Sequence, residues 1–388
     1  MAVTEVITKG FFGTLMDSLK RVLGGFGMLL LAPLLLFWNE CRSVQTAKSL
    51  EEGAGMVVSV GSDAVVAGNE GKLVHTTGDS DTSETLSDDQ FQIKAKGFRM
   101  ERSVEMYQWI ESENTRTEND KEITTWTYNK GWSSELKDYT DFKEIEGHIN
   151  PTSIPYEGKS YQVSRGTLGA FELDNDEISK LSSFEPLDVT EEQAALSGGA
   201  AKAHNGQIYI GADPASPTVG DVRVAFKIVR VGPMSIVGKQ AGSGFAPFQT
   251  EAGDQLLMVS PSIKSAEVMF EDAKQANVAM TWGIRFMGFL MISAGFAAIF
   301  GPLKVIADRV PFIGDVIEGG IGLISMLLSV VVTFFVIAAA WIVARPLLGI
   351  LLFLVGIGGI VGIVMLVLKA KKAKAGAAPA APADAAAS

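Results

Sequence analysis

Three apolar runs of membrane-spanning length crowd the C-terminal part of this chain, at residues 282–303, 321–344 and 346–368. Each run is long enough to cross about 30 Å of hydrocarbon as a helix that rises about 1.5 Å per residue. A shorter apolar run, residues 22–38, lies near the start, and mostly polar residues separate it from the other three. This layout predicts an integral membrane protein whose polar middle folds outside the bilayer.

The run at residues 22–38 has two interpretations. Lys20 and Arg21 precede it, as basic residues precede the apolar region of a cleaved secretory signal. A signal peptidase needs small residues after that region, however, and here Phe37 and Trp38 are followed by a polar pair. Tryptophan at the edge of a span is typical of a retained membrane helix. We therefore expect residues 22–38 to form the first transmembrane helix.

Basic residues near the spans predict the orientation, because cytoplasmic flanks carry an excess of lysine and arginine. They occur before the first span, between the second and third, and after the fourth, as Lys9, Lys20, Arg21, Lys304, Arg309, Lys369, Lys371, Lys372 and Lys374. With four spans these three flanks fall on one side, the cytoplasm. Residues 39–279 then lie on the other side, and Arg345 is the exception to the pattern.

Alternating apolar and polar residues predict that residues 39–279 are rich in β-strands. The clearest pattern places Val222, Val224, Phe226 and Ile228 on one face. The segments 70–96 and 205–228 resemble each other. This echo indicates either a duplication, with repeats at about 55–145 and 200–260, or only the general similarity of any two hairpins. We expect Trp109, Trp126 and Trp132 to fill the core of this domain.

The fold class is therefore an α+β membrane protein with four transmembrane helices and a large β-rich extracytoplasmic domain. This domain is duplicated if the similarity between segments 70–96 and 205–228 reflects a repeat. A helix that begins near Ser262 is expected to continue through Trp282 into the second span. The expected segments are a cytoplasmic N-terminus (1–21), transmembrane helices (22–38, 280–303, 320–344 and 346–368), the extracytoplasmic domain (39–279), a cytoplasmic amphipathic link (304–319) and a basic, then disordered, cytoplasmic tail (369–388).

Charge and cysteine content limit the possible partners. Residues 39–279 contain 38 Asp and Glu against 22 Lys and Arg, in a chain of net charge −11. Nucleic acid binding requires a basic face, so nucleic acid is excluded as a partner. The single cysteine, Cys41, cannot form a disulfide within the chain. It is open to three interpretations: a buried thiol, a lipidation site or a bridge between subunits.

Residue patterns for chemistry are missing. His75, His148 and His204 are widely separated, and no HExxH, CxxC or GxSxG motif occurs. A glycine cluster suggests a phosphate-binding loop, at Gly356, Gly358, Gly359 and Gly362. Such a loop needs a preceding strand and a following helix, and this cluster lies inside an apolar run that has neither. We therefore expect no catalytic residue, no cofactor and no metal site, and we do not expect an enzyme.

Small residues in the spans indicate helix packing, because they let helix backbones approach closely in lipid. The candidate packing or oligomerisation residues are Gly24, Gly27, Gly288, Gly295, Gly358 and Gly362. Packing within one chain and contacts between subunits are both compatible with this pattern. Residues that mark the membrane boundaries are Trp38, Trp282, Arg285, Arg345 and Pro346. Arg285 is interpreted as an anchor whose side chain extends outward, in preference to a residue of an ion pathway.

Several motifs together resemble the LUMA family of membrane proteins over nearly the whole chain. They are NECR (39–42), TAKSLEEG (46–53), NEGKLVH (69–75), VEMYQW (104–109), the aromatic residues Tyr128, Trp132 and Phe142, GHINP (147–151), GDVRV (220–224), PFQT (247–250), TWGIR (281–285) and RPL (345–347). The family tends to have glycine where this chain has Cys41, so thiol chemistry there is not expected to be a shared function.

The resemblance implies a four-span protein with its large loop in the endoplasmic-reticulum lumen or, in bacterial members, the periplasm. The alanine-rich C-terminus and the absence of N-glycosylation motifs indicate a bacterial member, so the nuclear partners of animal members are not carried over. We expect a homo-oligomeric membrane scaffold that organises membrane lipids or other membrane proteins. An oligomeric cation-channel-like pore is the second hypothesis, and a lipid hydrolase that uses His75 or His148 is the third.

Overall fold

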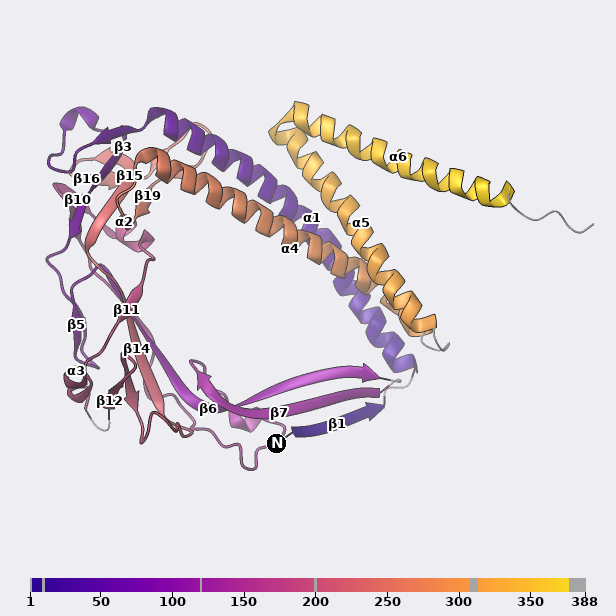
Figure 1. Cartoon of the computed structure of the whole chain (residues 1–388), viewed down its shortest axis with the longest axis horizontal. Coiled ribbons are helices and arrows are strands. Elements are labelled where there is room, and N and C mark those ends of the chain that lie inside the picture. Colours follow the sequence, from indigo (N-terminus) through magenta and orange to yellow (C-terminus); the bar gives the residue numbers. More distant parts are fainter. Residues whose placement is uncertain (1, 9–10, 119–120, 199–200, 308–312, 377–388) are drawn as a thin grey trace, which may run out of the picture. The chain divides into compact units, whose positions relative to one another are not determined.

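The computed structural model describes residues 2–8, 11–118, 121–198, 201–307 and 313–376. The chain divides into two compact units. The first comprises Met1–Phe11 and Thr46–Ala276, and the second comprises Phe12–Gln45 and Asn277–Ser388. The elements in Figure 1 confirm the predicted α+β class, with membrane-length helices and a large β-rich region.

Among the residues that the structure describes, three helices contain stretches that are long and apolar enough to cross a membrane, at Gly13–Met56, Ala266–Ala307 and Gly319–Ala344. They belong to α1 (Phe11–Met56), α4 (Ala266–Ala307) and α5 (Ile313–Ala344). The predicted fourth span lies in α6 (Pro346–Gly376), where the described side chains form only a shorter apolar stretch, Pro346–Gly359. Within the described residues the fourth span is therefore not confirmed.

The long helices extend beyond the predicted spans. α1 includes the polar residues 39–56 in the same unbroken helix, and it contains Pro33. The predicted helix that enters the second span is confirmed, because α4 continues without a break past Gly283. The link predicted at residues 304–319 is helical as far as Ala307 and again from Ile313, and its centre lies outside the described residues. The predicted tail is helical as far as Gly376, and the rest of it lies outside them too.

The larger sheet of the first unit is antiparallel. Among the described residues its main order is β1 (Ala2–Thr8), β7 (Lys121–Ser133), β6 (Arg99–Glu118), β14 (Val222–Val229), β13 (Gln207–Ile210) and β12 (Ala201–His204). Two further strands join it, β11 (Glu185–Leu187) on β14 and β8 (Lys159–Gln162) on β6. The sheet is thus centred on the long strand β6.

The second sheet has the order β10 (Phe171–Leu173), β9 (Gly166–Leu168), β3 (Leu73–Asp81), β15 (Gly232–Ala241) and β16 (Gly244–Ala246). It is extended by β19 (Met258–Ser260) and β2 (Val58–Val60). The remaining elements are short: β4 (Leu86–Asp88), β5 (Ile93–Ala95), β17 (Phe248–Gln249), β18 (Gln255–Leu256), α2 (Asn175–Lys180), α3 (Glu191–Leu196), and single turns at Ala67–Asn69 and Tyr139–Asp141.

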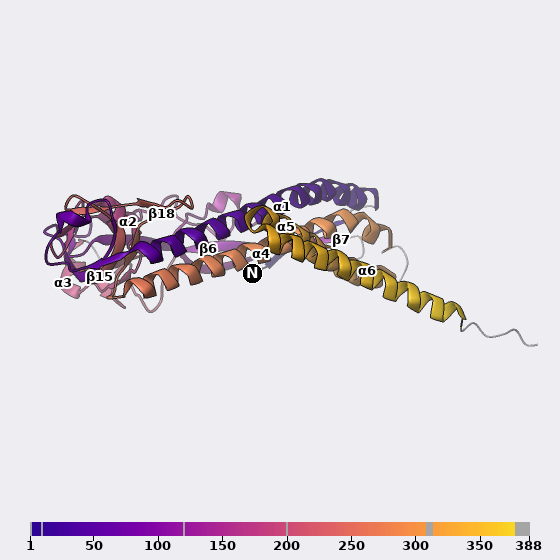
Figure 2. The ribbon, with the colours of Figure 1, turned by 90° about the horizontal axis from the view of Figure 1, so that it is seen from above.

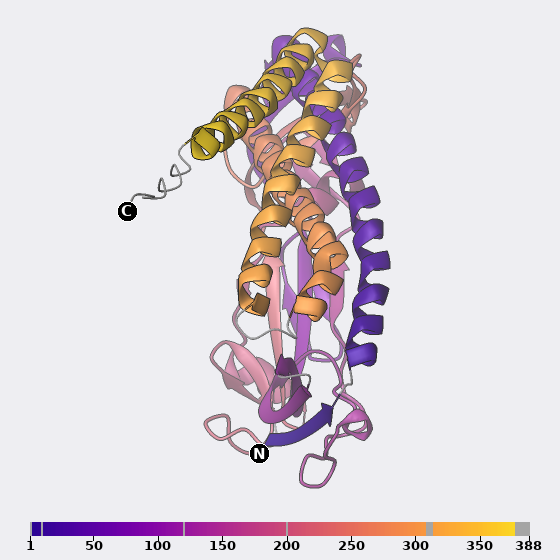
Figure 3. The ribbon, with the colours of Figure 1, turned by 90° about the vertical axis from the view of Figure 1, so that its right-hand side faces the viewer.

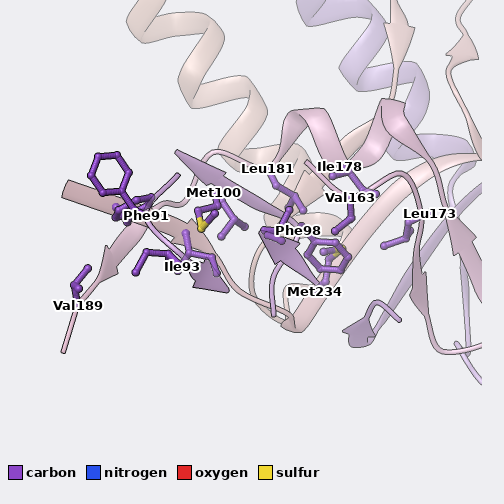
Figure 4. Packing of buried hydrophobic residues seen from close by; sticks show 14 of the residues in the cluster. Phe91, Ile93, Phe98, Met100, Val163, Leu173, Ile178, Leu181, Val189 and Met234 are labelled. Carbon is purple, nitrogen blue, oxygen red and sulfur yellow. The ribbon is translucent and has the colours of Figure 1, made fainter. Parts of the chain in front are cut away.

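The main core of the first unit confirms the face predicted for the clearest strand. In β14, Val222, Val224, Phe226 and Ile228 are all buried, as strict alternation requires of a strand with one face on a core. Figure 4 shows residues of other strands, of α2 and of connecting segments packed together in this core, among them Phe98, which directly precedes β6.

The tryptophan prediction is wrong. Trp109, Trp126 and Trp132 are each only half-buried and belong to none of the described core clusters. Their rings are covered instead by cations, namely Lys130 over Trp109, Lys143 over Trp126 and Arg223 over Trp132. Tryptophan is apolar enough to suggest burial, but its face also attracts cations at a surface.

The predicted duplication is not confirmed by the strand pairing. In the second half of the echo β13 and β14 pair with each other. In the first half β3 pairs with β2, β9 and β15, and β5 pairs with β4. The two halves of the echo therefore have different partners and lie in different sheets.

Strand β1 was not predicted. Residues 2–8 pair with β7 along the full length of β1, with Thr4 opposite Thr125. The basic flanks predicted that residues 1–21 and residues 39–279 lie on opposite sides of a membrane. Paired strands must lie on the same side of a membrane, so this pairing and a single crossing by α1 exclude each other in one chain.

Candidate functional site

Helices α1 and α4 form an antiparallel pair in the second unit. Ala32 and Leu36 of α1 and Ile292 of α4 are fully buried and form the centre of an apolar cluster. The two helices lie side by side in Figures 1 and 2. Their contact residues recur every three or four positions, which is the spacing of one face of a helix.

Two glycines allow the closest approach of this pair. A Cβ atom on Gly25 would lie 2.7 Å from the backbone oxygen of Gly295, and a Cβ on Gly295 would lie 3.0 Å from the backbone oxygen of Gly25. Gly288 lies against Leu36, whose side chain a Cβ would meet at 2.6 Å. The structure therefore uses Gly288 and Gly295 within the chain, and of the three glycines in the first span, Gly24, Gly25 and Gly27, it uses Gly25.

The other glycines named from the sequence do not pack against a neighbouring helix of the described chain. A Cβ on Gly24, Gly27, Gly358 or Gly362 would meet nothing within 4 Å. In α6, Gly356 packs against the ring of Phe334 in α5, and Gly349 packs against the backbone of Ile342. These four glycines are thus available for contacts that the single chain does not make.

A set of polar side chains joins three helices where α1 and α4 leave the apolar cluster. We call it the polar cluster. It consists of Asn39, Glu40, Arg42, Ser43, Asn277, Thr281, Arg285 and Trp341. The first four residues come from α1, the next three from α4 and the last from α5. All of them belong to the second unit.

Glu40 lies at the centre of the polar cluster and is 1% exposed. Arg285 donates from Nε to Oε1 at 2.6 Å and from Nη2 to Oε2 at 2.7 Å. Trp341 donates from Nε1 to Oε2 at 2.7 Å. A two-pronged guanidinium–carboxylate pair is both strong and specific in its geometry. One carboxylate thus fixes α1 to α4 and to α5.

Neutral hydrogen bonds continue the polar cluster along α1 and α4. The Asn39 amide donates to the backbone oxygen of Thr281 at 3.2 Å, and the Asn277 amide donates to the backbone oxygen of Ser43 at 2.9 Å. The Thr281 hydroxyl lies 2.8 Å from that of Ser43. Polar side chains that bond across helices are a known source of specific association in membranes.

The boundary residues surround this polar cluster. Trp38 and Trp282 are 53% and 64% exposed, and the Arg285 guanidinium lies 4.8 Å from the centre of the Trp282 ring. The Arg285 side chain is held by Glu40, which follows the first apolar run on the same helix α1. Arg345 is the single non-helical residue between α5 and α6, and Pro346 begins α6. Figure 3 shows α6 turning back from the end of α5.

The histidines do not converge on a reactive site. His75 Nε2 is 2.8 Å from the backbone oxygen of Lys264, and its Nδ1 is 3.3 Å from Ser59 Oγ. His148 is sandwiched between Tyr128 and Trp109. No group of three or more metal-ligating side chains occurs in the described part of the chain. Cys41 is a half-buried free thiol.

Sequence reasoning missed the role of Glu40, although it named both NECR and TWGIR as motifs. A signal was present, since a buried acid beside an apolar span requires a basic partner. Choosing Arg285 from many basic residues, however, requires the antiparallel register of α1 and α4. The structure brings these two motifs, and Trp341 near RPL, to one place.

These features define a class, a membrane protein of several long apolar helices in which a β-rich region lies, in sequence, between two paired helices. A sequence model of the family described as Transmembrane protein 43 matches residues 106–346. The chain belongs to this family, which is the LUMA family identified from the motifs.

The relatives agree with this assignment. The chain is 31% identical to human Transmembrane protein 43 over 358 residues, which cover 88% of this chain and 89% of the human protein. It is 31% identical to the mouse protein, covering 89% of this chain and 90% of that protein. It is 29% identical to the Drosophila melanogaster homologue, covering 83% and 88% respectively. No solved structure was found to match the chain.

Proposed function

We propose that this protein is a self-associating integral membrane scaffold that organises membrane proteins or lipids and catalyses no reaction. The polar cluster is the observation that carries the proposal. Both carboxylate oxygens of Glu40 already accept hydrogen bonds, from Arg285 and Trp341. A charge held in this way stabilises a defined arrangement of helices and is poorly placed to bind a passing ion or substrate.

The open glycine faces support self-association. Gly358 and Gly362 on α6, like Gly24 and Gly27 on α1, meet nothing within 4 Å. Faces of small residues are where membrane helices of neighbouring subunits approach. We propose a homo-oligomer that uses these faces, with residues 39–279 periplasmic in a bacterial inner membrane.

The mass of the protein in native nanodiscs tests this proposal. We expect an oligomer, and we expect Gly358→Leu combined with Gly362→Leu to shift it to smaller species. Gly322→Leu is the matched control, because that glycine of α5 also meets nothing within 4 Å but belongs to neither proposed face. A monomer in the wild-type protein would contradict self-association. Bilayer currents that are lost when Arg285 is replaced would favour a channel instead.

A further inference from the structure

Arg42 of the polar cluster is a positive charge without an acidic partner in the described chain. Its Nη2 donates to Asn39 Oδ1 at 3.3 Å and to Thr281 Oγ1 at 3.4 Å, and both distances are longer than is typical of N–H···O bonds. Glu40 is bound by Arg285 instead. The polar cluster contains these two arginines and one glutamate, so its net charge is +1.

Arg42 lies at one end of an exposed stripe on α1. We call it the α1 stripe, and it consists of Leu31, Leu34, Trp38 and Arg42. At about 3.6 residues per turn these positions share one side of the helix. That side is opposite Leu36, which is fully buried against α4. Leu31, Leu34 and Trp38 are exposed, and the Arg42 guanidinium is 6.0 Å from the centre of the Trp38 ring. The apolar part of the α1 stripe is therefore not covered by the described chain.

The order of groups along the α1 stripe matches the layers of one membrane leaflet. Trp38 ends the predicted span of residues 22–38, and tryptophan favours the membrane boundary. Arg42 is one turn further, about 6 Å along the helix axis. The polar head-group layer on each side of the hydrocarbon is about 5–7 Å thick. Arg42 is thus at the depth of the phosphates, and Leu34 and Leu31 are at the depth of the acyl chains.

We propose that the α1 stripe binds an anionic phospholipid, with the phosphate at Arg42 and an acyl chain along Leu34 and Leu31. Guanidinium groups bind phosphate through charge-assisted hydrogen bonds. The net positive charge of the polar cluster favours an anionic head group over a zwitterionic one, whose own cation would lie beside Arg42. The site deepens the proposed function by naming a class of lipid, and it rests on the proposed membrane position of α1 but not on self-association.

Photo-crosslinking tests the site in the full-length protein in nanodiscs. The probes are phosphatidylglycerol and phosphatidylcholine, each with a diazirine near the ester end of an acyl chain, and mass spectrometry locates the labelled residues. We expect phosphatidylglycerol to label α1 around Leu34 several-fold more than phosphatidylcholine does. Arg42→Gln should abolish this preference. Arg21→Gln is the matched control, because Arg21 is exposed at the other end of the same apolar run, and it should leave the preference unchanged.

Two further measurements do not depend on how well Arg42→Gln folds. Arg42→Lys keeps the positive charge, so it should keep most of the preference for phosphatidylglycerol. In the wild-type protein, added salt should lower labelling by phosphatidylglycerol toward that by phosphatidylcholine, because salt screens exposed charges.

The outcomes separate the lipid site from other occupants of the α1 stripe. Equal labelling of the wild type by both lipids would show ordinary boundary lipid only and would overturn the proposal. An unchanged preference in Arg42→Gln would also overturn it. So would a disulfide between copies of Leu34→Cys, in a Cys41→Ala background, without lipid label, because a second copy would then cover the stripe.

The mass of the protein in the same nanodiscs separates this proposal from the proposed function. An oligomer that shows no lipid preference would contradict the lipid site alone. A monomer that keeps the preference would contradict self-association alone.

Discussion

Glu40 is a buried carboxylate whose hydrogen-bond donors come from two other helices. The effect of replacing Glu40 on stability depends on whether its partner Arg285 remains charged. Removing one partner of a buried ion pair leaves an uncompensated charge and costs about 3–5 kcal/mol, whereas replacing both with apolar residues is often neutral. The polar cluster is therefore expected to matter for specificity of helix packing, more than for net stability.

Replacing Glu40 alone should reveal this asymmetry. We expect Glu40→Gln to lower the free energy of unfolding by about 3–5 kcal/mol, because Arg285 keeps its charge and loses its partner. The measurement is denaturant unfolding in nanodiscs, followed by tryptophan fluorescence. Glu51→Gln, at an exposed position of the same helix, is the control. The double change Glu40→Met with Arg285→Met should recover most of the loss, and a double variant as unstable as the single one would contradict this account.

Glu177 predicts a pH dependence in the first unit. It is buried at the start of α2, where Oε2 accepts the Asp174 backbone N–H at 3.0 Å, and Oε1 has no hydrogen-bond partner among the described residues. Burial raises the pKa of Glu177 from 4.5 to about 7. Between these values the folded state keeps a proton that the unfolded state releases. Stability from this group therefore falls as pH rises from about 4.5 to about 7.

Glu177→Gln should remove that dependence. The amide can still accept the Asp174 N–H and carries no charge to bury. We expect the variant to be more stable than the wild type at pH 8, by up to about 3 kcal/mol, and similar to it at pH 4.5. Thermal unfolding across this pH range measures the difference. Glu172→Gln, at an exposed position nearby, should leave the pH profile unchanged. A parallel profile for wild type and Glu177→Gln would show that this carboxyl does not titrate as described.

The pairing of α1 with α4 depends on which glycine faces the partner helix. An added methyl group at Gly25 would lie 2.7 Å from a backbone oxygen, whereas one at Gly24 would meet nothing. Overpacking of this kind typically costs about 1–3 kcal/mol. We therefore expect Gly25→Ala to lower the unfolding midpoint in nanodiscs by more than Gly24→Ala does. The reverse order would show that the two helices pack through a different face.

This glycine pair also shows how far the sequence could predict the elements. Composition and length located the long helices, and strict alternation located the buried face of β14. The small residues predicted close packing, but the rotation of α1 relative to its partner is decided by contacts with α4. The sequence alone therefore could not tell which of Gly24, Gly25 and Gly27 faces α4. Glu40 and Arg285 are 245 positions apart in sequence. No local spacing rule connects residues at such a distance.

Strand β1 can be tested by its register. Thr4 lies opposite Thr125, and directly opposed residues of an antiparallel pair are close enough for a disulfide. In a Cys41→Ala background, we expect Thr4→Cys and Thr125→Cys to form a crosslink upon oxidation. Thr4→Cys with Asn129→Cys, which lies outside the β1 register, is the control and should not crosslink. The opposite result would be that neither cysteine pair forms a crosslink and that a membrane-impermeant thiol reagent reaches positions 4 and 125 from opposite sides of the membrane. In that case β1 does not belong to the sheet, and the four-span topology stands.

Considered as a whole molecule, the chain has an excess of acidic residues between α1 and α4 and an excess of basic residues in the rest of the sequence. This asymmetry predicts the side of the membrane on which each part lies. In a Cys41→Ala background, a membrane-impermeant maleimide added to spheroplasts should label Ser243→Cys in the β-rich domain. It should not label Ala373→Cys in the lysine-rich end of α6. Labelling of position 373 alone would mean an inverted orientation.

One hydrogen bond of the polar cluster has a consequence for how such a molecule can be altered. The Asn277 amide donates to the backbone oxygen of Ser43 at 2.9 Å, so the polypeptide leaves the helical hairpin and re-enters it at adjacent points. Closely spaced entry and exit points are what make a domain insertion tolerable. The segment between these two points is therefore expected to be replaceable, like an inserted domain. A short loop, or an unrelated domain with neighbouring termini, could be spliced in its place and still leave a hairpin that inserts and pairs.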